Sequence, residues 1–388
     1  MLHILWIIVQ IVIGYQLVIP FILYVFYILK GGYKAANNLT PPAEKDYAII
    51  VTAYEQTTLL PAVVESILKL DYSNYLVYIV ADNCDISDLH FNDERVILLR
   101  PETVLAGNTR SHFYAIAHFK RNHEILTIID SDNLVEPNYL KELSPFFEAG
   151  FEAVQGVRAA KNLNTTYACL DAARDIYYHF YDCEVLFTLG SSATLSGSGM
   201  AFTTSLYKDA LEKLDVKGAG FDKVLQAQIV KNDKRIAFAY NAVVYDEKTT
   251  HSDQLVKQRS RWINTWFKYF GYGFNIIGRG IKNFSINQFL FGIILLRPPL
   301  FLFILASGLC CFINLFIFPV YSLIWVIAMA MFVLSFYISL KRHPIDERIY
   351  RSLVNIPKFI YFQLVSLVYA KNANKRSVAT KHPTEIKA

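Results

Sequence analysis

Hydrophobic positions are concentrated at the two ends of the chain, and the segment between them alternates short apolar and polar stretches. No charged residue occurs from Ile4 to Leu29, a run of 26 positions, and about 20 apolar residues suffice for a helix to cross a bilayer. A signal peptide would need a basic start, a shorter apolar core and a small-residue cleavage site, and this run has none of them. The pattern predicts an N-terminal transmembrane helix over residues 1–31.

A second uncharged stretch runs from Pro298 to Leu340 and has 43 residues. One helix cannot use that length and two can, so we predict a transmembrane hairpin within 286–340 that turns at Asn314–Pro319. A last apolar stretch, Phe359 to Ala370, has only 12 residues and a lysine on each side. Its length favours an interfacial or re-entrant helix over a fourth span, within a basic cytosolic segment over 341–388.

Basic residues gather beside these apolar stretches, which is typical of the cytoplasmic side of a membrane protein. They are Lys30, Lys34, Lys341, Arg342, Lys371, Lys375 and Arg376. This placement predicts a multi-pass protein of the cell inner (plasma) membrane, in contact with the lipid bilayer, whose middle domain is cytoplasmic. The net charge of +5 is modest and forms no basic stripe, so we expect no nucleic-acid partner.

The cysteines point to a reduced compartment. There are five of them, an odd number whose spacing fits neither a disulfide framework nor a zinc site. They are Cys84, Cys169, Cys183, Cys310 and Cys311.

The middle segment, 45–255, alternates strand-length apolar runs with helical patterns. This alternation predicts an α/β domain with a mostly parallel sheet that is covered on both faces. The predicted strands are Tyr47–Ala53, Leu76–Ala81, Val96–Leu99 and Ile125–Ile129, and the predicted helices are Leu59–Leu70, Arg110–Phe119, a helix starting at Pro137, and Lys223–Val230.

Polar and acidic residues follow three of these strands. In such sheets, ligands bind beyond the carboxyl ends of the strands, so these residues should converge on one binding edge. Each of them alone has an ordinary explanation, because Asp and Asn are common in turns and helix caps. The residues are Thr52, Ala53, Tyr54 and Glu55 after the first strand, Asp82 after the second, and Asp130 and Asp132 after the fourth.

The pair Asp130 and Asp132 is the sharpest candidate for a metal site. Carboxylates are hard oxygen ligands for Mg²⁺ or Mn²⁺, and such ions share their remaining positions with substrate phosphates and water. Two aspartates separated by one residue are frequent by chance. Their position directly after the apolar run Ile125–Ile129 favours a metal that binds a diphosphate.

Three later features add candidates. The small-residue loop Gly197-Ser198-Gly199 allows close backbone approach to a ligand, although it also suits a tight turn. Asp222 precedes a helical stretch and is either a reactive acid or a helix-capping residue. Gln258, Arg261 and Trp262 share one face of a predicted amphipathic helix over 256–284, which favours phosphate binding or a position at the lipid headgroups.

Taken in order, these residues resemble a known family. The motifs VTAYE, ADNCD, DSD, GSGMAF, FD and QRSRW are similar to those of family 2 inverting glycosyltransferases with the GT-A fold, a Rossmann-like domain, in the cellulose-synthase-like and hyaluronan-synthase-like membrane branch. The resemblance covers about residues 46–275. It implies a cytosolic GT-A domain flanked by transmembrane and interfacial helices, with Gln258, Arg261 and Trp262 as its QxxRW motif.

The resemblance also implies a role for each candidate. Asp222 would be the general base, and Asp130 and Asp132 the DxD motif that binds Mg²⁺ or Mn²⁺. The other roles would be nucleotide-sugar binding by Thr52, Ala53, Tyr54, Glu55, Asp82, Asp130 and Arg110, and acceptor or diphosphate binding by Gly197, Ser198, Gly199, Gln258, Arg261 and Trp262.

Three positions depart from the family pattern. Phe221 stands where the family has an acid before the base, Gln56 replaces a glutamate of the first motif, and Arg110 matches the basic residue after the third strand only poorly.

The expected activity is transfer of a sugar from a UDP-linked donor to a saccharide hydroxyl with inversion, in synthesis of an extracellular polysaccharide or cell-surface glycan. Two alternatives stay open. One is single-sugar transfer to a lipid acceptor such as a glycolipid. The other is a catalytically silent membrane protein that binds nucleotide sugars, for which the Phe221 change is the support.

Overall fold

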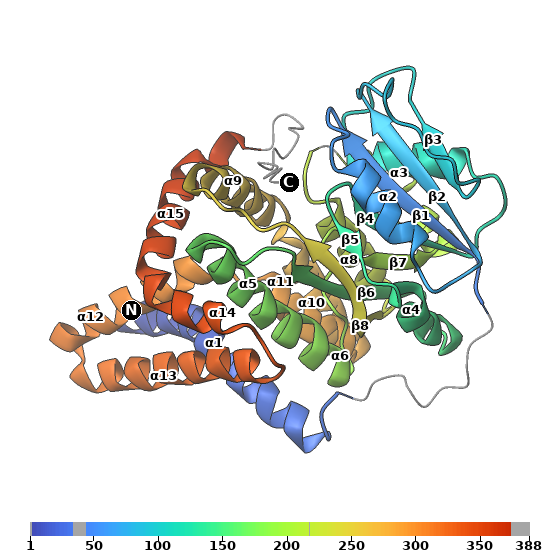
Figure 1. Cartoon of the computed structure of the whole chain (residues 1–388). Helices are drawn as coiled ribbons and strands as arrows, with labels where there is room; N and C mark the ends of the chain where they lie inside the picture. The colour runs from blue at the N-terminus through green and yellow to red at the C-terminus, as the bar shows by residue number, and fades with distance from the viewer. Residues whose placement is uncertain (1, 34–43, 217, 374–388) are drawn as a thin grey trace.

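The computed structural model describes residues 2–33, 44–216 and 218–373 as a mixed α/β domain attached to a group of apolar helices (Figure 1). Lys34, Lys375 and Arg376, three of the basic residues predicted to flank the membrane, lie outside the described residues. The sheet has eight strands in the order β3-β2-β1-β4-β7-β6-β8-β5. They are β1 (Tyr47–Tyr54), β2 (Tyr75–Asp82), β3 (Val96–Leu99), β4 (Ile125–Asp130), β5 (Leu134–Val135), β6 (Ala153–Ala160), β7 (Met200–Thr203) and β8 (Ile236–Asp246).

The first half of the sheet matches the prediction. Strands β1 to β4 pair in parallel and are separated by α2 (Leu60–Leu68) and α3 (Asn108–Ala117). The second half was not predicted and is mixed, since β7 runs antiparallel to both β4 and β6, and β5 runs antiparallel to β8. Only β6 and β8 are parallel there.

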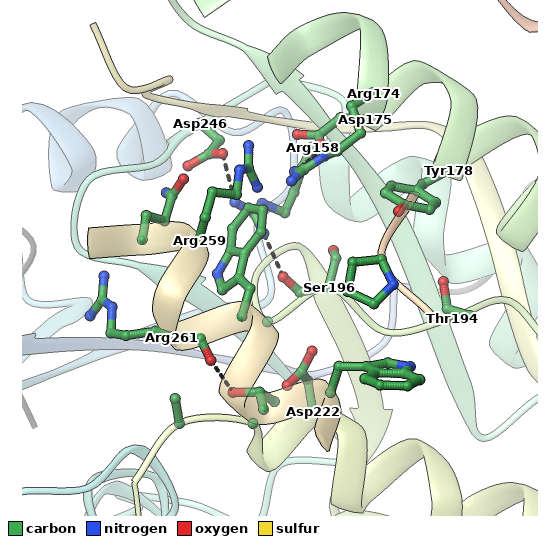
Figure 2. A pocket seen from close by; sticks show the side chains of 18 of the residues that line it. Arg158, Arg174, Asp175, Tyr178, Thr194, Ser196, Asp222, Asp246, Arg259 and Arg261 are labelled. Carbon is green, nitrogen blue, oxygen red and sulfur yellow. Dashed lines mark hydrogen bonds and ion pairs between the residues drawn. The ribbon is translucent and has the colours of Figure 1, made fainter. Parts of the chain in front are cut away.

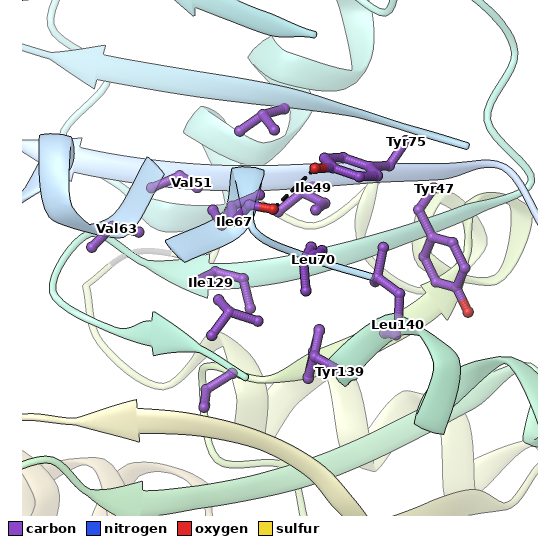
Figure 3. Close-up of a cluster of buried hydrophobic side chains, with 14 of the residues drawn as sticks. Tyr47, Ile49, Val51, Val63, Ile67, Leu70, Tyr75, Ile129, Tyr139 and Leu140 are labelled. Carbon is purple, nitrogen blue, oxygen red and sulfur yellow. Dashed lines mark hydrogen bonds between the residues drawn. The ribbon is translucent and has the colours of Figure 1, made fainter. Parts of the chain in front are cut away.

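Alternate residues of the central strands are buried on opposite faces of the sheet, as a sheet covered on both sides requires. On one face, Tyr47, Ile49 and Val51 of β1 pack with α2 and with α4 (Tyr139–Glu148), and Figure 3 shows this layer, including the hydrogen bond from the Tyr75 hydroxyl to the Ile67 carbonyl at 3.0 Å. On the other face, residues such as Ile50 pack with α3, α7 (Thr204–Leu211) and α8 (Phe221–Lys231).

Among the described residues, four helical runs are long and apolar enough to cross a membrane. Two of them, α12 (Leu300–Ile317) and α13 (Pro319–Lys341), form the predicted hairpin, whereas residues 286–295 form a separate helix, α11 (Ile286–Leu295), against the sheet domain. The first, α1 (Leu2–Leu29), packs on both α12 and α13. Polar side chains join these helices, with Trp325 Nε1 donating to Gln10 Oε1 at 2.8 Å, a device typical of helix packing in lipid.

The fourth helical run is longer than the sequence pattern indicated. It extends from Glu347 to Tyr369, 23 residues, through α14 (Glu347–Ser352) and α15 (Ile356–Tyr369). A run of this length could cross the membrane. The interfacial or re-entrant placement therefore stays a prediction, and a fourth transmembrane helix is the alternative.

The predicted amphipathic helix is two helices, α9 (Ser252–Tyr269) and α10 (Tyr272–Asn283). The QxxRW motif lies on α9, which packs along α15. The remaining helix, α5 (Thr166–Tyr178), continues into a π-helix, His179–Val185, and then α6 (Leu186–Thr188).

Candidate active site

The ends of the parallel strands meet at one edge of the sheet, as predicted. Thr52 at the end of β1 lies opposite Asp130 of β4, and Tyr54 lies opposite Asp82 of β2. A cavity of about 1460 Å³ opens at this edge and extends toward α9 (Figure 2). The predicted residues that line it are Thr52, Ala53, Tyr54, Glu55, Asp82, Asp130, Asp132, Gly197, Asp222, Gln258, Arg261 and Trp262.

Four predicted residues are placed differently from their expected contacts. Arg110 does not line the cavity, because its guanidinium pairs with Asp215 at 2.9 Å. Ser198 and Gly199 lie behind the wall. Ser198 Oγ accepts the backbone N–H of Asp130 at 3.0 Å, and a Cβ on Gly199 would lie 2.9 Å from the Val244 side chain.

The fourth is Asp82, which lines the cavity while its carboxylate supports a loop. It accepts the backbone N–H groups of Leu105 at 2.9 Å and Ala106 at 2.7 Å. Asp82 therefore holds the 105–106 segment next to the cavity.

Asp130 and Asp132 form a strained acidic pair. Burial raises the pKa of Asp130 to about 7, with the Asp132 carboxylate adding to the rise and Arg158 opposing it. The side-chain amide of Asn133 donates to Asp132 Oδ1 at 3.0 Å. A divalent cation between the two carboxylates would relieve their repulsion, and both are hard oxygen ligands. The pair therefore fits Mg²⁺ or Mn²⁺.

The described part of the chain does not by itself supply a full set of metal ligands. Within residues 2–33, 44–216 and 218–373, no three His, Cys, Asp or Glu side chains are grouped to hold an ion. A cation bound by two aspartates would therefore take its other ligands from water and from substrate phosphates, which is the usual arrangement for Mg²⁺.

Behind the pair lies a buried charge network that the sequence reasoning missed. Arg158 pairs with Asp246 at 2.6 Å, and Lys248 bridges Asp246 at 2.8 Å and Asp175 at 2.5 Å. Although burial alone would raise the pKa of Asp246, Arg158 and Lys248 hold it well below its ordinary value. These charges are fixed in place at neutral pH. Asp246 ends β8, so the strand-end rule finds it once β8 is recognised.

A second part of the network supports the QxxRW helix. Arg259 of α9 forms a buried ion pair with Asp171 of α5, which also pairs with Arg174 at 3.1 Å. The guanidinium carbons of Arg259 and Arg174 lie 4.1 and 4.3 Å from the Trp262 ring centroid, within cation–π range. Arg259 stands inside the motif letters QRSRW, and its role was not predicted. Figure 2 shows Arg259 directed toward the part of the wall that holds Arg158 and Asp246.

Asp222 lies in the first turn of α8, where the helix dipole favours a carboxylate. Its Oδ2 is 3.2 Å from Lys223 Nζ. Gly220, the residue before α8 begins, has φ +98°, and a Cβ there would lie 2.6 Å from Thr265 of α9. Only glycine lets the start of α8 approach the QxxRW helix this closely, and this contact places Asp222 in the same cavity as Trp262.

Phe221 has a clear packing role. It is 5% exposed, and its ring lies 5.0 Å from the ring of His112. Burial lowers the pKa of His112 to about 3, which keeps it neutral. The side chain before Asp222 thus points into an apolar core region, where a carboxylate would be unfavourable.

The chain is similar to known proteins in sequence family and in fold. A family model described as glycosyltransferase like family 2 matches residues 42–265. Among solved structures, the mannosyltransferase PcManGT from Pyrobaculum calidifontis, in complex with GDP-Man and Mn²⁺, has a TM-score of 0.56 at 14% identity, covering 92% of this chain and 99% of that one. S. aureus TarS 1-349, in complex with UDP-GlcNAc, has a TM-score of 0.44 at 14% identity, covering 85% and 90%.

No curated protein matches the chain in sequence. The likeness to the mannosyltransferase establishes the fold, and the family model extends over more than half of the chain. The chain has the GT-A fold and belongs to family 2 of the glycosyltransferases.

Proposed function

We propose that this glycosyltransferase moves a sugar from a nucleotide-diphosphate sugar to an acceptor hydroxyl with inversion at the anomeric carbon, and that Asp222 is the base. The observation that carries the proposal is the meeting of three groups in one cavity. These are the acidic pair Asp130 and Asp132, the carboxylate of Asp222, and the QxxRW side chains of α9.

The donor would lie along the strand ends. The residues at the end of β1 line the cavity beside Asp82 and would contact the nucleobase and the ribose. They are Thr52, Ala53, Tyr54 and Glu55. The solved mannosyltransferase was obtained with GDP-Man and Mn²⁺, which supports a nucleotide-sugar donor here. The resemblance of the motifs to the cellulose-synthase-like and hyaluronan-synthase-like branch favours a UDP-sugar.

Asp130 and Asp132 would hold Mg²⁺ or Mn²⁺ with the donor diphosphate. When bound, the cation stabilises the negative charge that builds up on the leaving diphosphate. On the protein side, Arg158 and Lys248 hold Asp246 charged behind the pair, and Gln258 and Arg261 line the same cavity. Arg261 would bind the diphosphate through its guanidinium.

The reaction would be a single displacement. The acceptor oxygen forms a bond to the anomeric carbon while the bond from that carbon to the diphosphate oxygen breaks, and Asp222 takes the hydroxyl proton. Removal of a proton by a positioned base contributes typically about 10²–10⁴-fold. One displacement inverts the configuration, so an α-linked donor gives a β-linked product.

The acceptor has two candidates. The motif resemblance favours a saccharide, as in synthesis of an extracellular polysaccharide or cell-surface glycan, with Gly197 and Trp262 at its ring. The continuation of the cavity between membrane-type helices favours a lipid. The core role of Phe221 removes the support for a silent protein, since that residue does not replace the base.

The basic flanks support a plasma-membrane location with a cytoplasmic catalytic domain, because Arg342 and Lys341 end α13 next to that domain.

The proposal is tested by incubating the detergent-solubilised full chain with UDP- and GDP-sugars and Mn²⁺ or Mg²⁺ while measuring nucleotide release. We expect release with one donor, loss of release with a chelator, and recovery on adding the metal. No release with any donor would overturn the proposal.

A further inference from the structure

The cavity has a second half that the donor does not need. Beyond Asp222 and Trp262 it continues between the membrane-type helices, where its lining is apolar. The lining comes from α12, α13 and α15 and includes Phe301, Ile304, Phe332, Val333 and Ile360. Each of these helices belongs to a run long and apolar enough to cross a membrane. A soluble sugar is polar and would gain little from contact with this apolar lining.

This apolar half reaches the outer surface of α13. Val333 and Tyr337 line the cavity and yet remain 64% and 49% exposed. The helices on the two sides pack elsewhere, since α13 packs on α1 and α12, and α15 packs on α9. The cavity is therefore accessible from the side that a bilayer would cover, and an acyl or isoprenoid chain has a path into it.

The junction between the two halves carries unsatisfied polar atoms. Asp182 of the π-helix forms a buried ion pair with Arg297, which precedes α12. Among the described residues, Asp182 Oδ1 and Gln226 Nε2 are buried without a hydrogen-bond partner, and both residues line the cavity. Because Gln226 is four residues after Asp222 on α8, the two lie on the same face of the helix.

A buried polar atom without a partner costs about 1–3 kcal/mol. A ligand that supplies the partners recovers this free energy. One carboxyl oxygen and one amide N–H, next to the proposed base, fit a headgroup with hydroxyl groups.

The charges at the junction argue against a charged headgroup. The cations beside Asp182 and Asp222 are each already paired, Arg297 with Asp182 and Lys223 with Asp222. A phosphate placed between these two pairs would face both carboxylates.

We propose that the acceptor is a membrane lipid with an uncharged, hydroxylated headgroup, such as a diacylglycerol or a glycosyl-diacylglycerol. The headgroup lies between Asp182, Gln226 and Asp222, and the chains lie between α12, α13 and α15. This inference rests on the proposed function, in which Asp222 takes the proton of the attacking hydroxyl. The oxygen–carbon bond forms on that lipid hydroxyl as the nucleoside diphosphate leaves, which yields a glycolipid.

The test uses the full chain in phosphatidylcholine vesicles that contain diacylglycerol or glucosyl-diacylglycerol. A donor labelled in the sugar separates three readouts, namely label in the organic extract, label in aqueous oligosaccharide, and nucleotide release. The variant Val333→Trp places a large ring at the exposed opening. The matched control is Val326→Trp on the same helix, which is 51% exposed and does not line the cavity.

We expect organic-phase label only when the hydroxylated lipid is present. Val333→Trp should lower it at least tenfold while nucleotide release without lipid acceptor stays within twofold of the unmodified chain, and Val326→Trp should leave both unchanged. Asp182→Asn, which keeps an oxygen for Arg297, should raise KM for the lipid more than it lowers kcat.

Other outcomes overturn the inference in distinguishable ways. Aqueous labelled oligosaccharide that forms equally in Val333→Trp would disprove the lipid acceptor and leave the proposed function standing. Organic-phase label that appears only with a polyprenyl phosphate would disprove the uncharged headgroup. Absence of nucleotide release with every donor would remove the proposed function, and the lipid inference with it.

Discussion

The two ends of the cavity are built from different kinds of residue. The polar end collects the acids at the ends of β2, β4 and β8, and arginine and lysine hold the last of these, as in the pair Arg158–Asp246 at 2.6 Å. The apolar end is made of membrane-type helices and is lined by residues such as Phe301 and Phe332. Asp222 and Trp262 stand between the two.

The difference shows how one site can treat two unlike substrates. A charged donor is recognised by groups whose charges are fixed before it binds, so little reorganisation is needed when charge moves in the reaction. An apolar chain is recognised through burial, at about 25 cal/mol per Å² of apolar surface removed from water. Changes at the polar end should therefore affect turnover, and changes at the apolar end should affect acceptor use.

The largest effect is expected at the boundary between the ends. Asp222→Asn keeps the shape of the side chain and removes the base, so kcat for transfer should fall by about 10²–10⁴-fold. Affinity for the nucleotide, measured by titration calorimetry, should stay within threefold because the proposed role of Asp222 is proton transfer and not contact with the nucleobase. The control is Asp209→Asn, an exposed position on α7 outside the cavity. Unchanged transfer in Asp222→Asn would disprove the assignment of the base.

A smaller effect is expected within the polar end. Asp132→Asn removes one of two anionic metal ligands, and transfer at a fixed Mn²⁺ concentration should fall by about 10²-fold. Raising Mn²⁺ should recover part of the loss, whereas it should not rescue Asp222→Asn. Equal Mn²⁺ dependence in Asp132→Asn and the unmodified chain would show that the pair does not hold the metal.

The parallel strands of the polar end and the long apolar helices were predictable from sequence, whereas the second half of the sheet and the buried charge network were not. Strands β1, β2 and β4 are continuous apolar runs, so their positions and the acids at their ends, Asp82 and Asp130, follow from local pattern. Strand β5 has two residues, too few to show a periodicity. Strand β6 contains Gln155 and Arg158, polar residues that serve the site.

The contacts that join the domain to the membrane helices are also non-local. Asp171 and Arg259 lie 88 positions apart, and Asp182 and Arg297 lie 115 apart. No spacing rule links such pairs. The π-helix that carries Asp182 departs from the 3.6-residue repeat on which helix prediction depends.

A third prediction concerns what holds the two ends together. Glu184 of the π-helix is 1% exposed, accepts the Tyr27 hydroxyl of α1 at 2.5 Å, and pairs with Arg342 after α13 at 3.0 Å. Glu184→Gln should cost about 1.5–3 kcal/mol, the range for hydrogen bonds to a charged group.

The thermal midpoint of the detergent-solubilised chain measures this cost. The matched control is Glu347→Gln, whose partner Arg351 is also exposed and which should cost under about 0.5 kcal/mol. An equal midpoint for both variants would show that Glu184 does not anchor the membrane helices to the catalytic domain.

The smallest effect is a pH dependence confined to the polar end. Burial and the neighbouring Asp132 raise the pKa of Asp130 to about 7, so the carboxyl is protonated below that pH and ionised above it. A metal needs the ionised form. Below pH 7, the dissociation constant for Mn²⁺ should therefore rise by about tenfold per pH unit, and above pH 7 it should be nearly constant. In Asp132→Asn the repulsion is absent, so the pKa of Asp130 falls and the bend in the binding curve should move to lower pH. Titration of Mn²⁺ from pH 5.5 to 8.5, followed by electron paramagnetic resonance of the free ion, tests both expectations. A flat profile in the unmodified chain would mean that Asp130 stays ionised, in which case the acidic pair is not under the repulsion that makes a cation favourable there.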